Sequence, residues 1–160
     1  MRLTSPAFDD GETIPARYTP VNHNELPPLE FREVPAQARS LAVVIEDQDS
    51  PLGAEVTHWL AWNIPPETGH LDASALPEGV RLGTDSFGEV GYTGPNPPEG
   101  RHHYRFRVLA LDGELALAEG ATRSEFNRAV DGRILAEAEL TGVYENYIDE
   151  AGGEGAPGDE

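Results

Sequence analysis

The sequence predicts a mostly β protein: an antiparallel, Greek-key-like β-sandwich of two sheets with a few short peripheral helices. Three observations carry this prediction. Runs with strand character outnumber helical patterns, and long connections rich in Gly and Pro separate them. No alternation of strand and helix indicates βαβ units. The chain has 160 residues, which is enough for one core without disulfides, and it contains no cysteine.

Three segments carry the strongest strand signals. Residues 41–47 (LAVVIED) are a continuous apolar run ending in acid, which predicts a buried strand. Residues 57–64 (THWLAWNI) form a second strand, closed by two prolines that cannot donate to a ladder. Residues 102–112 (HHYRFRVLALD) form the third. Shorter extended pieces are expected at residues 3–8 and 29–31.

Helical signals are confined to the C-terminal third. Thr122 and Glu125 have the spacing of a capping box, so a helix is expected from there to Val130, with Gly132 interrupting it. Residues 134–140 (ILAEAEL) are expected to form a second short helical turn.

The organisation predicted is one domain over residues 1–148 and an acidic, disordered tail over residues 149–160. The opening residues lack an apolar run long enough for a signal peptide, and no later segment could span a bilayer. A cytoplasmic protein is therefore expected.

Charge is the strongest compositional signal. The chain has 29 acidic and 11 basic residues, all of the latter arginine, for a formal charge of −18. Screening by molar salt would remove most of the resulting repulsion, so we predict a high-salt cytoplasm and a halophilic source. The alternative is a high-GC mesophile that prefers arginine. Either way, nucleic acid binding and stable association with anionic membranes are not expected.

A histidine opens the second predicted strand. Strand alternation places His58 on the face of Leu60, Trp62 and Ile64. A histidine in such a setting is more often a hydrogen-bonded core residue than a ligand or a base.

The third predicted strand separates two sets of side chains. Alternation points His102 and Tyr104 inward, and it points His103, Arg105 and Arg107 outward. We interpret the outward set as a salt-bridged sheet face rather than a ligand patch.

Two long connections, at residues 47–57 and 83–101, are expected to be functional because loops of this length are otherwise uncommon. In the first, Asp47 and Asp49 either orient polar groups in a pocket or belong to a solvated turn. In the second, residues 94–100 (GPNPPEG) form a rigid loop, expected to aim backbone N–H groups of Gly94 and Asn96 at an anion.

Four motifs in order resemble one known family. They are Asp-x-Asp-x-Pro at 47–51, Thr-His-Trp at 57–59, Gly-Pro-x-Pro-Pro-x-Gly at 94–100 and His-x-Tyr at 102–104. Together they resemble the phosphatidylethanolamine-binding protein family, which includes the Raf kinase inhibitor protein, and in particular its prokaryotic branch. The resemblance covers residues 1–148.

The resemblance implies a β-sandwich with a shallow pocket for phosphate-like or carboxylate groups and no cofactor. The implied walls are Asp47, Asp49, Pro51, His58, Asn96, Pro97, His102 and Tyr104. The two histidines would bind the anion by N–H donation, more strongly when protonated, and Tyr104 would donate its hydroxyl. The carboxylates would fix the tautomers of the histidine rings.

Three positions depart from the family pattern. Gln48 stands where the family usually has proline, and His103 stands where it usually has arginine. Only Arg101 separates Gly100 from His102, which predicts a more open pocket rim.

The leading functional hypothesis is a non-enzymatic module that binds a small anion or an anionic headgroup, with a possible regulatory role. The first alternative is a metal-assisted hydrolase that uses Asp47, Asp49, His58 and His102. The second is an interaction protein that modulates a kinase or a protease. The protein partner is unknown, and a homodimer is left open.

Overall fold

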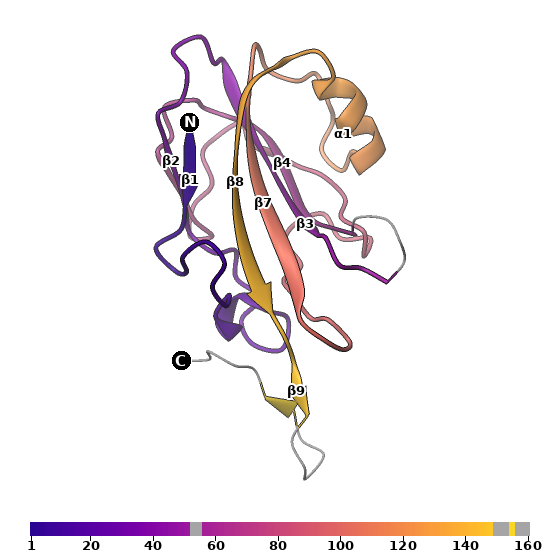
Figure 1. The fold of residues 1–160 in the computed structure, drawn as a ribbon. Coiled ribbons are helices and arrows are strands. Elements are labelled where there is room, and N and C mark those ends of the chain that lie inside the picture. The colour runs from indigo at the N-terminus through magenta and orange to yellow at the C-terminus, as the bar shows by residue number, and fades with distance from the viewer. Residues whose placement is uncertain (52–55, 149–153, 156–160) are drawn as a thin grey trace.

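The computed structural model describes residues 1–51, 56–148 and 154–155, and it contains two main antiparallel sheets (Figure 1). The larger sheet has the order β6-β4-β3-β7-β8 and the smaller has the order β1-β2-β5. The strands are β1 (Arg2–Thr4), β2 (Leu29–Arg32), β3 (Ser40–Asp47), β4 (Val56–Ile64), β5 (His70–Leu71), β6 (Arg81–Leu82), β7 (His102–Leu111), β8 (Ile134–Tyr144), β9 (Tyr147–Ile148) and β10 (Glu154–Gly155). A 3₁₀ turn, η1 (Ala16–Tyr18), and one helix, α1 (Arg123–Val130), complete the described elements. The predicted sandwich is confirmed.

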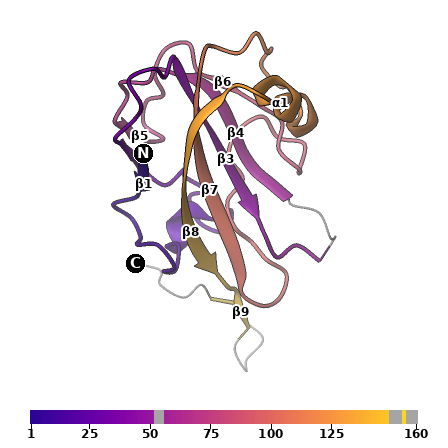
Figure 2. The ribbon, with the colours of Figure 1, turned by 45° about the horizontal axis from the view of Figure 1, so that its top comes forward.

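Strands β3 and β4 of the larger sheet are buried on both faces. The main core lies between the two sheets, and a second core lies under α1 on the opposite face (Figure 2). Strand β3 serves both cores: Leu41, Val43 and Ile45 enter the main one, and Ala42 and Val44 enter the second. This double burial explains why β3 reads as a continuous apolar run instead of an alternating one.

The predicted helix and its cap are confirmed in α1. The Thr122 hydroxyl accepts from the Glu125 backbone N–H, and the Glu125 carboxylate accepts from the Thr122 N–H. Phe126 and Val130 point from the helix into the second core.

The second predicted helix is wrong, because residues 134–140 belong to β8, which pairs with β7 along its whole length. Ala, Glu and Leu favour helices as isolated residues, but here they alternate with a period of two. Leu140 and Ala138 face the main core, whereas Glu137 and Glu139 pair with Arg107 and Arg105. Cross-strand pairing and burial override the local preference.

The predicted salt-bridged sheet face is confirmed, and it is centred on a buried carboxylate. The Glu46 side chain is fully buried, and its oxygens accept from Arg105 Nε at 2.7 Å and from Arg123 Nη2 at 2.8 Å. Arg107 Nη1 lies 3.7 Å from the same carboxylate. Arg123 belongs to α1, so this cluster ties the helix to β3 and β7.

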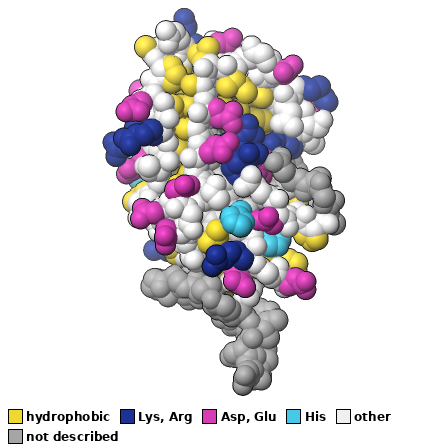
Figure 3. Space-filling model, viewed as in Figure 1, with side chains coloured by type: hydrophobic (Ala, Val, Ile, Leu, Met, Phe, Trp, Pro, Cys, Tyr) yellow, Lys and Arg dark blue, Asp and Glu magenta, His cyan; other side chains and the backbone are white. Residues whose placement is uncertain are grey.

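Acidic side chains are spread over the visible surface with basic ones among them (Figure 3), and over the whole sequence they outnumber the basic ones 29 to 11. We expect the free energy of unfolding to rise between 0.1 and 1 M KCl, because the Debye length falls from about 10 to about 3 Å over that range. The buried Glu46 cluster is screened less than the surface, so repulsion between surface charges sets the sign. A gain of about 1 kcal/mol would raise Tm by about 2–4 °C. Thermal unfolding in a KCl series measures this, and a flat or falling Tm would contradict both the repulsion and the predicted adaptation to salt.

No helix among the described residues is long and apolar enough to cross a membrane. Of the predicted acidic tail, only Glu154–Gly155 is described, as the short strand β10 beside β9. The rest of residues 149–160 lies outside the described residues, and the cytoplasmic location stays a prediction.

Candidate functional site

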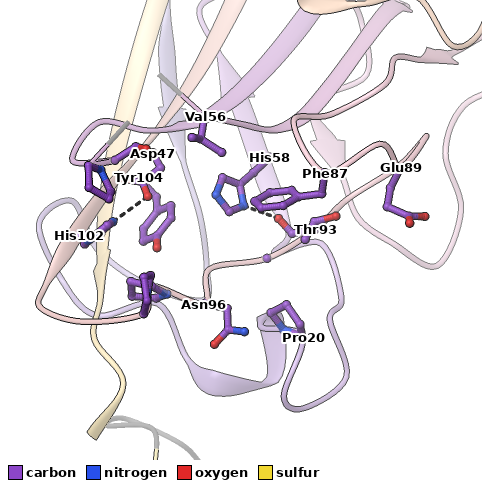
Figure 4. Close-up of a pocket in the computed structure, with 15 residues that line it drawn as sticks. Pro20, Asp47, Val56, His58, Phe87, Glu89, Thr93, Asn96, His102 and Tyr104 are labelled. Atoms are coloured by element: carbon purple, nitrogen blue, oxygen red, sulfur yellow. Dashed lines mark hydrogen bonds and ion pairs between the residues drawn. The ribbon is translucent and has the colours of Figure 1, made fainter. Parts of the chain in front are cut away.

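A pocket of about 510 Å³ opens at one end of the larger sheet (Figure 4). Strand β3 ends at Asp47, whose register partners are Val56 on β4 and Tyr104 on β7. Antiparallel pairing therefore brings the end of one strand and the starts of two others to the same edge. The pocket walls come from these strand ends and from the two connections that the sequence singles out.

Seven of the eight expected residues line this pocket: Asp47, Pro51, His58, Asn96, Pro97, His102 and Tyr104. They come from three strands and two loops, so the sandwich assembles what the sequence keeps far apart.

The face predicted for His58 is wrong. Leu60 and Trp62 pack in the second core under α1, whereas the His58 ring lies beside Tyr104 of the main core, with ring centroids 5.2 Å apart. Simple alternation along residues 57–64 would have pointed His58 away from the pocket.

A β-bulge is the physical reason. The register between β3 and β4 pairs Ile45 with Trp59 and then Glu46 with Thr57, which leaves His58 as the extra residue. A bulge re-aims a side chain at the cost of a local break in the ladder, and such bulges are frequent next to functional sites. Here it places His58 and Trp59 on the same side of the sheet.

The His58 ring is buried and held in one orientation. Its Nδ1 donates to the Thr93 carbonyl at 2.5 Å, and Phe87 and Tyr104 contact it with ring centroids 5.1 and 5.2 Å away. Burial lowers the pKa of His58 below its ordinary value, against the opposing effect of the Thr93 carbonyl. The neutral ring, protonated on Nδ1, therefore keeps a lone pair on Nε2.

His102 is fixed in the same way by a carboxylate. Its Nδ1 lies 2.7 Å from Asp47 Oδ2, and only 9% of each side chain is exposed. A neutral His102 donates to Asp47 through Nδ1 and carries its lone pair on Nε2. The expectation that a carboxylate fixes this ring agrees with the geometry.

Tyr104 lies between the two histidines. Its ring meets His58 edge-on at 5.2 Å and stacks on His102 at 6.4 Å. Burial is the main cause that raises the pKa of Tyr104 above its ordinary value, and the nearby Asp47 carboxylate acts in the same direction. The hydroxyl thus stays protonated and can donate a hydrogen bond.

Asp49 is the one expected residue that does not line the pocket. Its Oδ2 accepts from the backbone N–H of His103 at 2.6 Å and lies 2.7 Å from His103 Nδ1. Burial alone would raise the pKa of Asp49, but the hydrogen bonds from His103 hold it below its ordinary value. His103 thus keeps a carboxylate partner outside the pocket wall.

The loop at residues 94–100 makes other hydrogen bonds than those expected for an anion-binding loop. The Gly94 N–H does not face the pocket as a free donor, because it donates to Asn24 Oδ1 at 2.8 Å. Asn146 Nδ2 donates to Asn96 Oδ1 at 2.8 Å and to the Pro97 carbonyl at 3.0 Å. Two asparagines distant in sequence therefore fix this wall, and no local motif pointed to either of them.

Sequence reasoning also missed Asp85, Phe87 and Thr93. Asp85 is only 5% exposed, and its Oδ2 accepts from the Thr93 hydroxyl at 2.6 Å. Thr93 in turn accepts from His58, so Asp85 supports the histidine through one intermediate residue. The one signal in the sequence was the length of the connection at residues 83–101. It marked the loop as functional but did not identify these three residues.

Of the four residues of the metal-hydrolase alternative, Asp47, His58 and His102 line the pocket and Asp49 does not. Asp49 faces His103 instead of the pocket, and Asp47 is committed to His102 and to the Asp49 backbone N–H. Within residues 1–51, 56–148 and 154–155, no three acidic or histidine side chains are grouped to hold a metal ion.

Comparison with known proteins supplies an independent line of evidence. A family model described as phosphatidylethanolamine-binding protein matches residues 4–145. A UPF0098 protein of Methanothermobacter thermautotrophicus is 43% identical over 149 residues, which cover 90% of this chain and 98% of the relative.

Two crystal structures are also similar. A phosphatidylethanolamine-binding protein homologue from Chlamydia trachomatis has a TM-score of 0.85 and 38% identity, over 90% of this chain and 96% of that one. YbcL of E. coli, described as a new member of the mammalian PEBP family, has a TM-score of 0.84 and 30% identity, over 90% of this chain and 97% of that one.

Proposed function

This chain belongs to the phosphatidylethanolamine-binding protein family, and from that premise we propose that its pocket binds a small anionic ligand without converting it chemically. The ligand class is a carboxylate, a phosphate or a phospho-headgroup. One observation carries the proposal: two buried histidines, each fixed through Nδ1, flank the Tyr104 hydroxyl in one pocket.

The hydrogen bonds of the histidines determine when they can hold an anion. Since Nδ1 of His58 donates to Thr93 and Nδ1 of His102 donates to Asp47, each neutral ring has only a lone pair left on Nε2. A lone pair repels an anion. Protonation places an N–H on Nε2 and a positive charge on the ring, and both favour the anion.

We therefore expect anion affinity to rise as pH falls from 8 to 5.5. The pKa of His58 lies below its ordinary value, so the free protein keeps this ring neutral into the acidic part of this range. Anion binding there is accompanied by uptake of a proton on His58, and affinity therefore continues to rise as pH falls. Each proton taken up contributes at most about a tenfold gain in affinity per pH unit. Calorimetric titration of acetate at constant ionic strength measures the slope, and an affinity independent of pH would contradict capture by protonated histidine.

His58→Ala and His102→Ala test the site directly. Each change removes one charge-assisted hydrogen bond of about 1.5–3 kcal/mol, so we expect about a 10- to 100-fold loss of affinity for acetate and for phosphate. Titration in molar KCl keeps the acidic surface screened.

His70→Ala is the matched control. His70 also pairs with a carboxylate, Asp72 Oδ2 at 2.9 Å, but it is exposed on β5 and does not line the pocket. Its loss should leave anion affinity unchanged within about twofold. Unchanged affinity in both pocket variants would overturn the proposed function.

A further inference from the structure

The pocket is larger than an inorganic anion requires. Its volume of about 510 Å³ lies in the range of clefts that take organic ligands, about 300–1,000 Å³. The histidines and Tyr104 occupy only part of its wall. Apolar side chains make up much of the rest: Pro20, Pro51, Val56, Phe87, Pro97 and Pro98. Such a wall leaves room for an apolar body beside the anionic group.

Phe87 is the most unusual member of this wall. Its side chain is 52% exposed, although aromatic side chains are usually buried, and its ring meets His58 edge-on at 5.1 Å (Figure 4). The ring thus lies next to the anion-binding group and still presents surface to solvent.

A buried carboxylate restrains the backbone turn that carries this exposed ring. Asp85 Oδ1 accepts from the backbone N–H groups of Phe87 and Glu89, each at 2.9 Å, and the Asp85 N–H donates to the Glu89 carbonyl at 2.8 Å. Three hydrogen bonds to one residue that is 5% exposed restrict the turn that carries Phe87. A preorganised aromatic surface binds a ligand at a lower entropic cost than a mobile one.

The charges of the pocket disfavour a ligand with more than one negative charge. Glu89 and Asp47 both line the wall, and among the described residues no arginine does. The cationic groups that the lining can offer are therefore the two histidines, of which His58 resists protonation because it is buried. A dianion would meet Asp47 beside the histidines and Glu89 farther along the wall (Figure 4), with two histidines to compensate its charge.

We infer that the physiological ligand is an aryl monoanion, with its single acid group at His58, His102 and Tyr104 and its ring against Phe87. This inference rests on the proposed function and specifies the ligand class. The contact would bury apolar surface of both rings, and about 50 Å² of buried apolar area corresponds to nearly a tenfold gain in affinity.

The test compares benzoate with acetate, which carry the same carboxylate with and without an aryl ring. We expect the protein to bind benzoate about tenfold more tightly. Phe87→Ser should reduce that ratio to below about threefold, because benzoate alone has a ring that contacts Phe87. Leu135→Ser removes a similarly exposed apolar side chain, 45% exposed on β8, and should change neither affinity.

Glu89→Gln tests the charge limit with phenyl phosphate, a dianion above pH 7. This variant should raise phenyl phosphate affinity at least threefold more than benzoate affinity. Equal affinities for acetate and benzoate, with acetate binding still lost in His102→Ala, would overturn this inference and leave the proposed function standing. If neither acid binds in a histidine-dependent way, both fail.

Discussion

Glu46→Gln is expected to lower the free energy of unfolding by about 3 kcal/mol, because it leaves guanidinium groups facing a neutral side chain at a fully buried position. This is the lower end of the range for a broken buried ion pair. We choose it because Arg105 and Arg123 keep 23% and 21% of their side-chain surface exposed, so water replaces part of the lost interaction.

The acid dependence of stability has the same origin. Burial alone would raise the pKa of Glu46, but Arg123 and Arg105 hold it below its ordinary value. A carboxyl group whose pKa is lowered on folding stabilises the protein above its unfolded pKa of about 4.3, and this contribution is lost as pH falls through the lower folded value. Glu46→Gln should therefore flatten the loss of stability below about pH 4.

Glu137→Gln is the control for this prediction. Glu137 accepts from Arg107 Nε at 2.9 Å on the same sheet face, but 35% of its side chain is exposed. Glu137→Gln should lower the free energy of unfolding by less than about 1 kcal/mol. Denaturant titrations of the wild type and both variants in a series from pH 7 to pH 3 measure these differences. Equal losses at pH 7 would show that burial of the carboxylate does not govern the energetics of the cluster.

Gly94→Ala is expected to disrupt the pocket wall. A Cβ at this position would lie 2.0 Å from the Tyr18 carbonyl oxygen and 3.0 Å from Thr19 Cα, which are both backbone atoms. The segment must shift, and it carries the Thr93 carbonyl that holds His58. We expect a loss of about 1–3 kcal/mol in stability and at least tenfold in anion affinity.

Nuclear magnetic resonance of the histidine rings separates a displaced His58 from a general loss of stability. In Gly94→Ala, the His58 Nδ1–H should lose its strong hydrogen bond, a result that does not depend on any ligand. Gly100→Ala is the control at the other end of the loop: its φ is +79°, but no atom lies within 4 Å of the added Cβ. It should cost about 1 kcal/mol of backbone strain and leave both His58 and binding unchanged. An unchanged His58 signal in Gly94→Ala would show that the close approach to Tyr18 does not position the histidine.

Part of the site follows from local pattern. Alternation along β7 is enough to point His102 and Tyr104 inward and Arg105 outward, since β7 pairs with β3 and β8 without a register shift over these residues. The capping box before α1 is also local, because its two hydrogen bonds join residues three positions apart.

Other features exist only because distant segments meet. The bulge that re-aims His58 depends on the register of β4 against β3. The requirement for glycine at residue 94 arises from Tyr18, and the brace on the same loop comes from Asn24 and Asn146.

The sequence by itself determined the sandwich and the capped helix, because strand periodicity and capping chemistry are short-range properties of the chain. Its resemblance to one family gave most residues of the pocket. Only the tertiary structure decided that residues 134–140 form a strand, where pairing with β7 overrides helix propensity. It also decided that Asp49 turns to His103. Each of these depends on a partner that no local pattern specifies.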